Sequence, residues 1–136
     1  MIVSRKHNEL TYYYLFDQVV ITGGYGENIV IPDIIDGREV TKISQRAFYN
    51  NANLKTLIIS EGVKEIGTGA FNNCPNLEYV KLPSTINKVR NAPFQGCNKI
   101  KYFINNSPLI NSKKFLGENY EEEMLEITFT EPQING

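Results

Sequence analysis

Apolar residues recur along this chain with a period of 23, as from Val40 to Val63 to Ile86. The pattern of residues 40–62 returns at 63–85 and again, less closely, at 86–108. A unit of this length cannot bury its apolar side alone, whereas stacked units cover one another. The sequence therefore predicts a short solenoid of three stacked coils. The further equivalent positions are Ile43, Ile66 and Val89; Phe48, Phe71 and Phe94; Leu54, Leu77 and Ile100; and Leu57, Val80 and Phe103.

Each unit divides into two parts. The segments LKTLIIS, LEYVKLP and IKYFINN alternate as short strands do, so we expect Leu57 and Ile59 to point inward and Thr56 and Ile58 outward. Residues 40–51 have apolar positions at nearly helical spacing, which predicts one or two α-helical or 3₁₀ turns. The predicted fold class is an α/β-type repeat solenoid with a parallel strand face and short helical or 3₁₀ turns opposite.

An open solenoid needs caps at its ends. Alternation before and after Asp17, with Phe16 as the last apolar position of the first run, predicts two strands and a turn, and hence a β-rich N-terminal cap. After Pro108 the period is no longer visible, so we expect a non-repeat C-terminal cap with a helix or loop at 112–123 and a one-sided strand at 125–129. The expected division of this single domain is an N-terminal cap at 8–39, repeats at 40–62, 63–85 and 86–108, a C-terminal cap at 109–131 and a mobile tail at 132–136.

One repeat carries a more specific motif, in which A-F-x-x-C precedes L-x-x-V-x-L-P-x-x-I. This motif resembles the BspA-type leucine-rich repeat, and the resemblance covers roughly residues 10 to 108. It implies a small curved solenoid with binding on the strand face and no catalytic residue. Pro93 and Asn105 depart from the pattern, so we expect a less regular third coil. The motif is carried by Ala70, Phe71, Cys74, Leu77, Val80, Leu82, Pro83 and Ile86.

Charge narrows the classes of partner. The chain has 14 basic and 15 acidic residues, so its balance does not favour nucleic acid or an anionic membrane. No apolar run approaches the roughly 20 residues of a membrane helix. The N-terminus has no signal-peptide pattern. We expect a cytoplasmic protein if Met1 is native, and a secreted or cell-surface protein if the chain has been trimmed.

Catalytic chemistry is poorly represented. His7 is the only histidine, and it lies near the terminus, where an exposed role is typical. Zinc would need four suitable ligands, and the chain offers no such spacing. The run Glu121 to Glu123 fits a solvated face, and Gly23, Gly24 and Gly26 fit a turn better than a phosphate loop. The sequence predicts a non-enzymatic protein without metal or cofactor.

Two cysteines, Cys74 and Cys97, occupy the same place in successive repeats. Stacking would make them neighbours, because adjacent strands lie about 4.8 Å apart. A disulfide is sterically conceivable. We favour two buried thiols that pack as small apolar residues, because the equivalent residue in the first repeat is Asn51.

The outward positions of the strands are the candidate binding residues. Tyr79 and Tyr102 should stack there, and tyrosine is enriched at binding hot spots. The alternative is that these side chains simply suit strands and stack on one another. We expect a protein-binding module that uses this face or the C-terminal cap, as a small intracellular inhibitor or as part of a bacterial surface adhesin. Self-association through an open strand edge is the third hypothesis. The candidate residues are Lys55, Ile58, Glu78, Tyr79, Lys81, Lys101, Tyr102 and Ile104.

Overall fold

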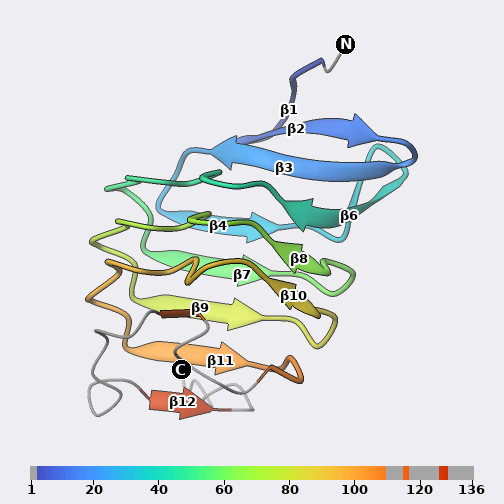
Figure 1. Cartoon of the computed structure of the whole chain (residues 1–136). Coiled ribbons are helices and arrows are strands. Elements are labelled where there is room, and N and C mark those ends of the chain that lie inside the picture. The colour runs from blue at the N-terminus through green and yellow to red at the C-terminus, as the bar shows by residue number, and fades with distance from the viewer. Residues whose placement is uncertain (1–2, 110–114, 117–125, 129–136) are drawn as a thin grey trace, which may run out of the picture.

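A computed structural model describes residues 3–109, 115–116 and 126–128 of the chain. These residues form coils that stack from an N-terminal cap down to β12 (Figure 1). A first sheet, here sheet A, contains β1 (Arg5–His7), β2 (Leu10–Leu15), β3 (Gln18–Gly24), β6 (Arg38–Ile43), β8 (Glu65–Ile66) and β10 (Lys88–Val89), with β5 (Ile34–Ile35) paired to β6. A second sheet, sheet B, has the order β12 (Glu126–Thr128), β11 (Tyr102–Asn105), β9 (Tyr79–Leu82), β7 (Thr56–Ile59) and β4 (Asn28–Ile31).

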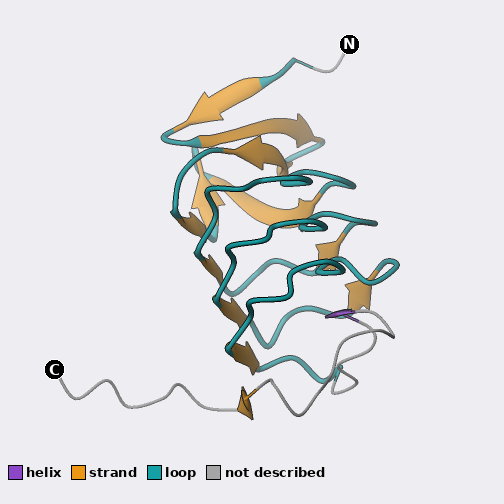
Figure 2. Cartoon of the chain, turned by 90° about the vertical axis from the view of Figure 1, so that its left-hand side faces the viewer, coloured by secondary structure: helices purple, strands orange, loops and turns teal. Residues whose placement is uncertain are grey.

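Sheet B is parallel throughout, and its register reproduces the period of the sequence. Leu57 lies opposite Val80, and Val80 lies opposite Phe103. In the view turned by 90°, these strands form one column (Figure 2). Loops connect this column to the strands of sheet A. Leu57 and Ile59 are buried while Thr56 and Ile58 are half-buried, so the predicted strand phase is confirmed.

The core lies between the two sheets and is built from equivalent residues of successive coils. Phe48, Phe71 and Phe94 form a stack of rings with 5.0 Å between neighbouring centroids. Ile43 and Ile66 pair in the same way between β6 and β8. All of these side chains are buried. The predicted stacked solenoid is therefore confirmed.

The predicted helical turns are wrong, and the fold is a β-solenoid. Residues 40–43 belong to β6, and the chain then turns through residues 45–50. Alternate backbone N–H groups of this turn donate to carbonyls of the next coil, while those of Ala47, Tyr49 and Asn51 donate to the carbonyl three residues earlier, and no helix results. Among the described residues, only Phe115 and Leu116 are helical. The donor–acceptor pairs are Arg46 to Thr68, Phe48 to Ala70 and Asn50 to Asn72.

The third coil is also more regular than its sequence indicates. β11 pairs with β9 in unbroken register, which ends with Asn105 opposite Leu82. Asn105 is buried, and its Oδ1 accepts hydrogen bonds from the backbone N–H (3.0 Å) and the hydroxyl (2.5 Å) of Ser107. A buried amide with hydrogen-bond partners avoids the cost of an unsatisfied polar group. The side chain that broke the apolar pattern therefore fits inside the coil.

The N-terminal cap contains the predicted hairpin. β2 and β3 pair antiparallel, and the turn between them passes through Phe16 and Asp17. The expectation that Phe16 continues the alternation of β2 is wrong, because it sits in the turn with a positive φ of 57° and is 93% exposed. Alternation requires an extended backbone, so it ends where the chain reverses.

The region after Pro108 continues the stack where it is described. β12 pairs parallel with β11, with Ile127 opposite Phe103. The Phe115 carbonyl accepts a hydrogen bond from the Phe94 N–H, and its ring lies 5.4 Å from that of Phe103. The period was invisible in the sequence because residue 103 pairs with residue 127, an offset one position longer than in the preceding coils. The rest of the helix or loop predicted at 112–123 and the tail at 132–136 lie outside the described residues, and the domain division remains a prediction.

Candidate functional site

The outward side chains of β4, β7, β9 and β11 form one surface, here called the strand face. Parallel pairing places equivalent residues of these strands side by side in rows. Each row runs along the axis of the stack. The first row is Asn28, Thr56, Tyr79 and Tyr102; the second is Val30, Ile58, Lys81 and Ile104.

The first row holds the two tyrosines that the sequence placed together. Tyr79 and Tyr102 lie opposite each other in the β9–β11 ladder. Their ring centroids are 6.4 Å apart and their planes are tilted by 50°. Tyr102 is 38% exposed and Tyr79 is half-buried. The row continues through the Thr56 hydroxyl, which donates to Asn28 Oδ1 at 2.7 Å.

The second row requires a correction. Ile104 was expected to lie on the exposed face, but its side chain is fully buried. It has a strand on each flank, with Lys81 of β9 on one side and Thr128 of β12 on the other. The sequence predicted the strand at 125–129, which is observed as β12, but it did not predict that this strand pairs with β11. Ile58 and Lys81 are half-buried and remain on the face.

A ladder of alternating charge borders the strand face, one residue before the tyrosine row. The backbones of these residues are hydrogen-bonded from strand to strand. The backbone N–H of Lys55 donates to the Glu27 carbonyl at 2.7 Å, and the backbone N–H of Glu78 donates to the Lys55 carbonyl at 2.8 Å. The backbone N–H of Lys101 donates in the same way to the Glu78 carbonyl at 2.8 Å. All of these residues are exposed. The ladder therefore places opposite charges beside each other from coil to coil, which avoids like-charge repulsion along the stack.

The sequence analysis missed the part of the face that β4 supplies. Val30 is 54% exposed and lies opposite Ile58, while Asn28 lies opposite Thr56. The offset from β4 to β7 is longer than the regular period, because β5 and its turn interrupt this coil. The alternation in NIVI was the available signal, but its spacing does not match that of the repeats.

The opposite side of the coil, on sheet A, carries a different charge cluster. Glu65 Oε2 lies 3.0 Å from Lys42 Nζ, and its Oε1 lies 3.4 Å from Arg90 and 3.8 Å from Lys88. Burial works to raise the pKa of Glu65, but the hydrogen bond to Lys42 and the three positive charges outweigh burial and lower it. This arrangement stabilises the ionised carboxylate and links three neighbouring strands.

Both cysteines are free and buried, as we favoured. The Cys74 thiol donates to the Phe48 carbonyl at 3.3 Å, and the Cys97 thiol donates to the Phe71 carbonyl at 3.0 Å. Each thiol thus reaches a carbonyl of the preceding coil. The interaction between the two thiols lowers the pKa of Cys74, whereas the same interaction and burial raise the pKa of Cys97. These features fit a packing role better than a reactive one.

Two further features are absent from the part of the chain that the structure describes. It contains no group of three or more His, Cys, Asp or Glu side chains able to hold a metal ion. None of its helical residues builds a helix with the length and apolar character needed to cross a membrane.

Solved structures of bacterial repeat proteins resemble this fold. A leucine-rich repeat protein from T. pallidum, TpLRR, is 25% identical with a TM-score of 0.68, covering 75% of this chain and 50% of its own. A leucine-rich repeat protein from Bacteroides capillosus is 19% identical with a TM-score of 0.69, covering 93% of this chain and 95% of its own. The pneumococcal vaccine antigen PcpA is 19% identical with a TM-score of 0.59, covering 79% of this chain and 31% of its own.

The sequence itself also matches a family model. A search of curated proteins found no match. The model described as the BspA type leucine rich repeat region, in six copies, matches residues 26–133. This range contains every strand of sheet B and part of sheet A, and the match covers well over half of the chain. The chain therefore belongs to the BspA-type leucine-rich repeat family.

Proposed function

We propose that this protein is a binding module that captures a partner protein on its strand face. Membership of a leucine-rich repeat family supports an interaction role in general terms. The specific surface rests on the geometry of sheet B. The proposed contact residues are Lys55, Ile58, Glu78, Tyr79, Lys81, Lys101 and Tyr102, to which Val30 is added and from which buried Ile104 is removed.

The tyrosine pair is the observation that carries this proposal. Two rings at 6.4 Å form a rigid amphipathic platform on a sheet that is already ordered. Tyrosine has few rotatable bonds, so little side-chain entropy is lost when a partner docks. Neither ring belongs to the buried core, so both contribute surface to the strand face.

The alternating charges beside the tyrosine row would orient a partner protein as it docks. Lys55, Glu78 and Lys101 stand beside the tyrosine row with alternating sign. Charges at the rim of an interface affect the rate of association and the choice of partner more than the raw affinity. A partner with a complementary alternation of charge would therefore be selected over one with a single sign.

A double substitution tests the strand face. Purified parent and Tyr79→Ala/Tyr102→Ala proteins are immobilised, and proteins retained from lysate are compared by mass spectrometry. A partner retained by the parent is then purified, and its affinity for both proteins is measured. We expect the double variant to keep its melting temperature and to lose at least about 2 kcal/mol of binding free energy.

A matched double variant supplies the control. Tyr13→Ala/Phe16→Ala also removes one half-buried and one exposed ring, but these belong to β2 and to the turn that follows it, outside sheet B. It should bind the partner as tightly as the parent. Equal affinity of the parent and the Tyr79→Ala/Tyr102→Ala protein would reject the strand face, and attention would pass to the region 109–131.

Two cellular settings remain proposals: a small intracellular inhibitor and part of a bacterial surface adhesin. They predict different places for the native protein. Fractionation of the source cells, followed by protease treatment of intact cells, distinguishes them. An adhesin is cleaved from intact cells, whereas an intracellular inhibitor is protected until the cells are lysed.

Self-association is a second candidate function, which one observation favours. β4 is an edge strand of sheet B, and its outward Val30 is 54% exposed. An unpaired strand edge is a template for another copy of the same chain. Light scattering after size-exclusion chromatography would show a dimer that Val30→Pro dissociates, because proline removes the backbone donor. A monomer at every concentration would eliminate this candidate.

A further inference from the structure

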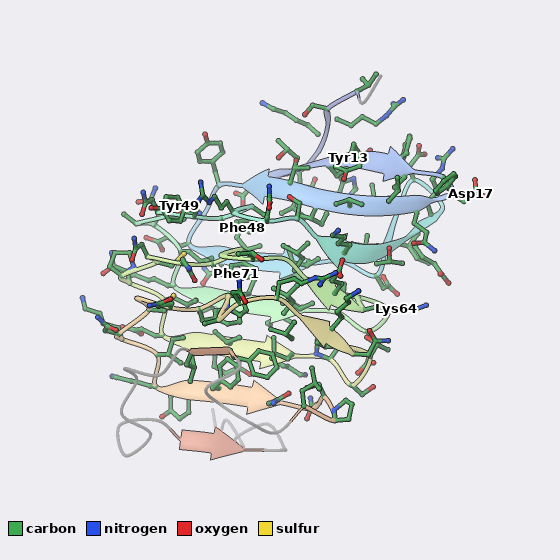
Figure 3. The ribbon with its side chains drawn as sticks, viewed as in Figure 1. Tyr13, Asp17, Phe48, Tyr49, Lys64 and Phe71 are labelled. Atoms are coloured by element: carbon green, nitrogen blue, oxygen red, sulfur yellow. The ribbon has the colours of Figure 1, made fainter. Side chains whose placement is uncertain are left out.

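Two neighbouring hollows lie on the side of the stack where the coils turn from sheet A to sheet B. Each has a volume of about 460 Å³, within the usual size range of small-ligand sites. Tyr49 belongs to the lining of both. It lies at the corner of the stack far from Asp17 and Lys64 (Figure 3). The strand face is formed by other residues, so a ligand in these hollows would leave that face uncovered.

The linings are uncharged and rich in amides. Among the described residues, none that lines either hollow carries a charge, although 21% of the chain is charged. Each amide offers two donors and one acceptor oxygen. A surface of this kind suits a neutral ligand with many hydroxyl groups and gives no ion pair to a charged one. The amides used here are Asn50 and Asn53 in the first hollow, and Asn72, Asn73, Gln95 and Asn98 in the second.

Aromatic rings flank the first hollow. Tyr25 is 79% exposed, while buried Phe48 forms part of the floor. The Arg46 guanidinium lies 5.7 Å from the Tyr49 ring centroid, and Tyr49 is nevertheless 46% exposed. The face of an aromatic ring carries partial negative charge, and the C–H bonds on one face of a pyranose carry partial positive charge. A sugar ring can therefore pack on tyrosine while its hydroxyls remain free for amides.

Backbone geometry holds several of these amides in place. Asn50 and Asn73 have positive φ values of 60° and 56°, a conformation that asparagine tolerates better than most residues. Asn72 Oδ1 accepts a hydrogen bond from the Gln95 N–H at 2.9 Å. These roles explain part of the asparagine content. They do not explain why two exposed tyrosines lie against the same hollows.

We infer that this side of the solenoid binds a neutral oligosaccharide. Tyr25 and Tyr49 support the sugar rings, and the amides receive the hydroxyl groups. Because the hollows meet at Tyr49, consecutive sugars occupy them as two subsites along the axis of the stack. This site is separate from the strand face, so either proposal can fail without the other.

Amide NMR titrations of the whole chain test the inference. The probes are four neutral hexasaccharides, of glucose in α and β linkage, of mannose and of N-acetylglucosamine, and one anionic heparin hexasaccharide. We expect at least one neutral probe to cause saturable shifts of the side-chain amide signals of Asn53 and Asn73. Tyr49→Ala and Tyr25→Ala should each weaken this binding by about tenfold.

Two variants serve as controls. Tyr49→Phe retains the ring and should keep most of the affinity, while Tyr102→Ala alters only the strand face and should bind the probe like the parent. Tyr25 is so exposed that Tyr25→Ala should fold even if Tyr49→Ala does not. The inference is overturned if no neutral probe causes saturable shifts, if only the heparin fragment binds, or if the folded tyrosine-to-alanine variants keep the parent affinity.

Discussion

Phe71 lies flat on Phe48, with ring centroids 5.0 Å apart and planes within 8° of parallel. Phe94 continues the stack on the other side of Phe71, also at 5.0 Å and within 5°. This stack of phenylalanine rings passes through three coils and is buried from solvent. The central ring therefore contributes contacts to both neighbouring coils, so its loss would affect the whole stack.

Phe71→Ala should lower the free energy of unfolding by about 3–5 kcal/mol, the usual cost of deleting a buried phenylalanine. Equilibrium urea unfolding followed by circular dichroism measures this change. Tyr25→Ala is the control, because it removes a ring that is mostly exposed. If both substitutions cost the same, the ring stack does not hold the coils together.

Gly67 lies against the backbone of the preceding coil. A Cβ added there would lie 2.5 Å from the Gln45 nitrogen and 2.8 Å from the Ser44 carbonyl carbon. Backbone atoms cannot move aside as a flexible side chain can, so Gly67→Ala should destabilise the protein by about 1–3 kcal/mol. Thermal unfolding compares it with Thr68→Ala at the adjacent exposed position. Equal melting temperatures would show that the coils have room to separate.

The cysteines should titrate as two thiols per chain in denatured protein that has not been reduced. In the native protein neither should react promptly with a thiol reagent, because both side chains are fully buried and closed to the reagent. A sample denatured after full reduction gives the reference value. Absence of thiols in the non-reduced sample would show a disulfide between the coils, and with it an oxidising compartment.

Glu65 should make stability depend on pH in the acid range. Its folded-state pKa is lowered, so the stabilisation by the ionised carboxylate is present above its unfolded pKa and is lost as pH falls through the folded value. Glu65→Gln should therefore destabilise the protein near neutral pH, and the difference from the parent should shrink in acid. Urea unfolding at a series of pH values measures this difference.

Exposed Glu39 on β6 provides the control for that experiment. At neutral pH, the free energy of unfolding of Glu39→Gln should differ less from that of the parent than the value for Glu65→Gln does. The difference in unfolding free energy between the parent and Glu65→Gln could also stay constant down to strongly acidic pH. That result would show that Lys42, Lys88 and Arg90 do not stabilise the fold through the ionised carboxylate.

Tyr14 should lose its hydroxyl proton at a higher pH than an ordinary tyrosine does. Its hydroxyl donates to Asp36 Oδ2 at 2.6 Å, and this hydrogen bond is the main cause that raises the pKa of Tyr14 to about 12. The favourable effect on stability is present below the ordinary tyrosine pKa and is lost as pH rises through about 12. Subtracting the ultraviolet titration of Tyr14→Phe from that of the parent isolates this group. A difference curve centred near the ordinary tyrosine pKa of about 10 would contradict the hydrogen bond to Asp36.

The candidate site was predictable in its central part only. Tyr79 and Tyr102 are one period apart, and any stacking of equal coils brings them together. Val30 joins the same face by pairing with Ile58, at an offset that the regular period does not predict. Ile104 has the phase of the exposed row, yet its side chain is buried, and β12 pairs with β11 at an offset that the regular period does not predict.

The sequence by itself determined that the chain forms stacked coils, because Phe48, Phe71 and Phe94 recur at one spacing and such residues can be buried only against their own equivalents. Tertiary structure decided the form of the turns. Apolar spacing within residues 40–51 suits a helix and a tight turn equally, and the choice depends on where the backbone donors find acceptors. In this protein every second donor of the turn finds its acceptor in the next coil, as Phe48 N–H does at the Ala70 carbonyl (2.7 Å). That partner is distant in sequence, so only the assembled stack can supply it.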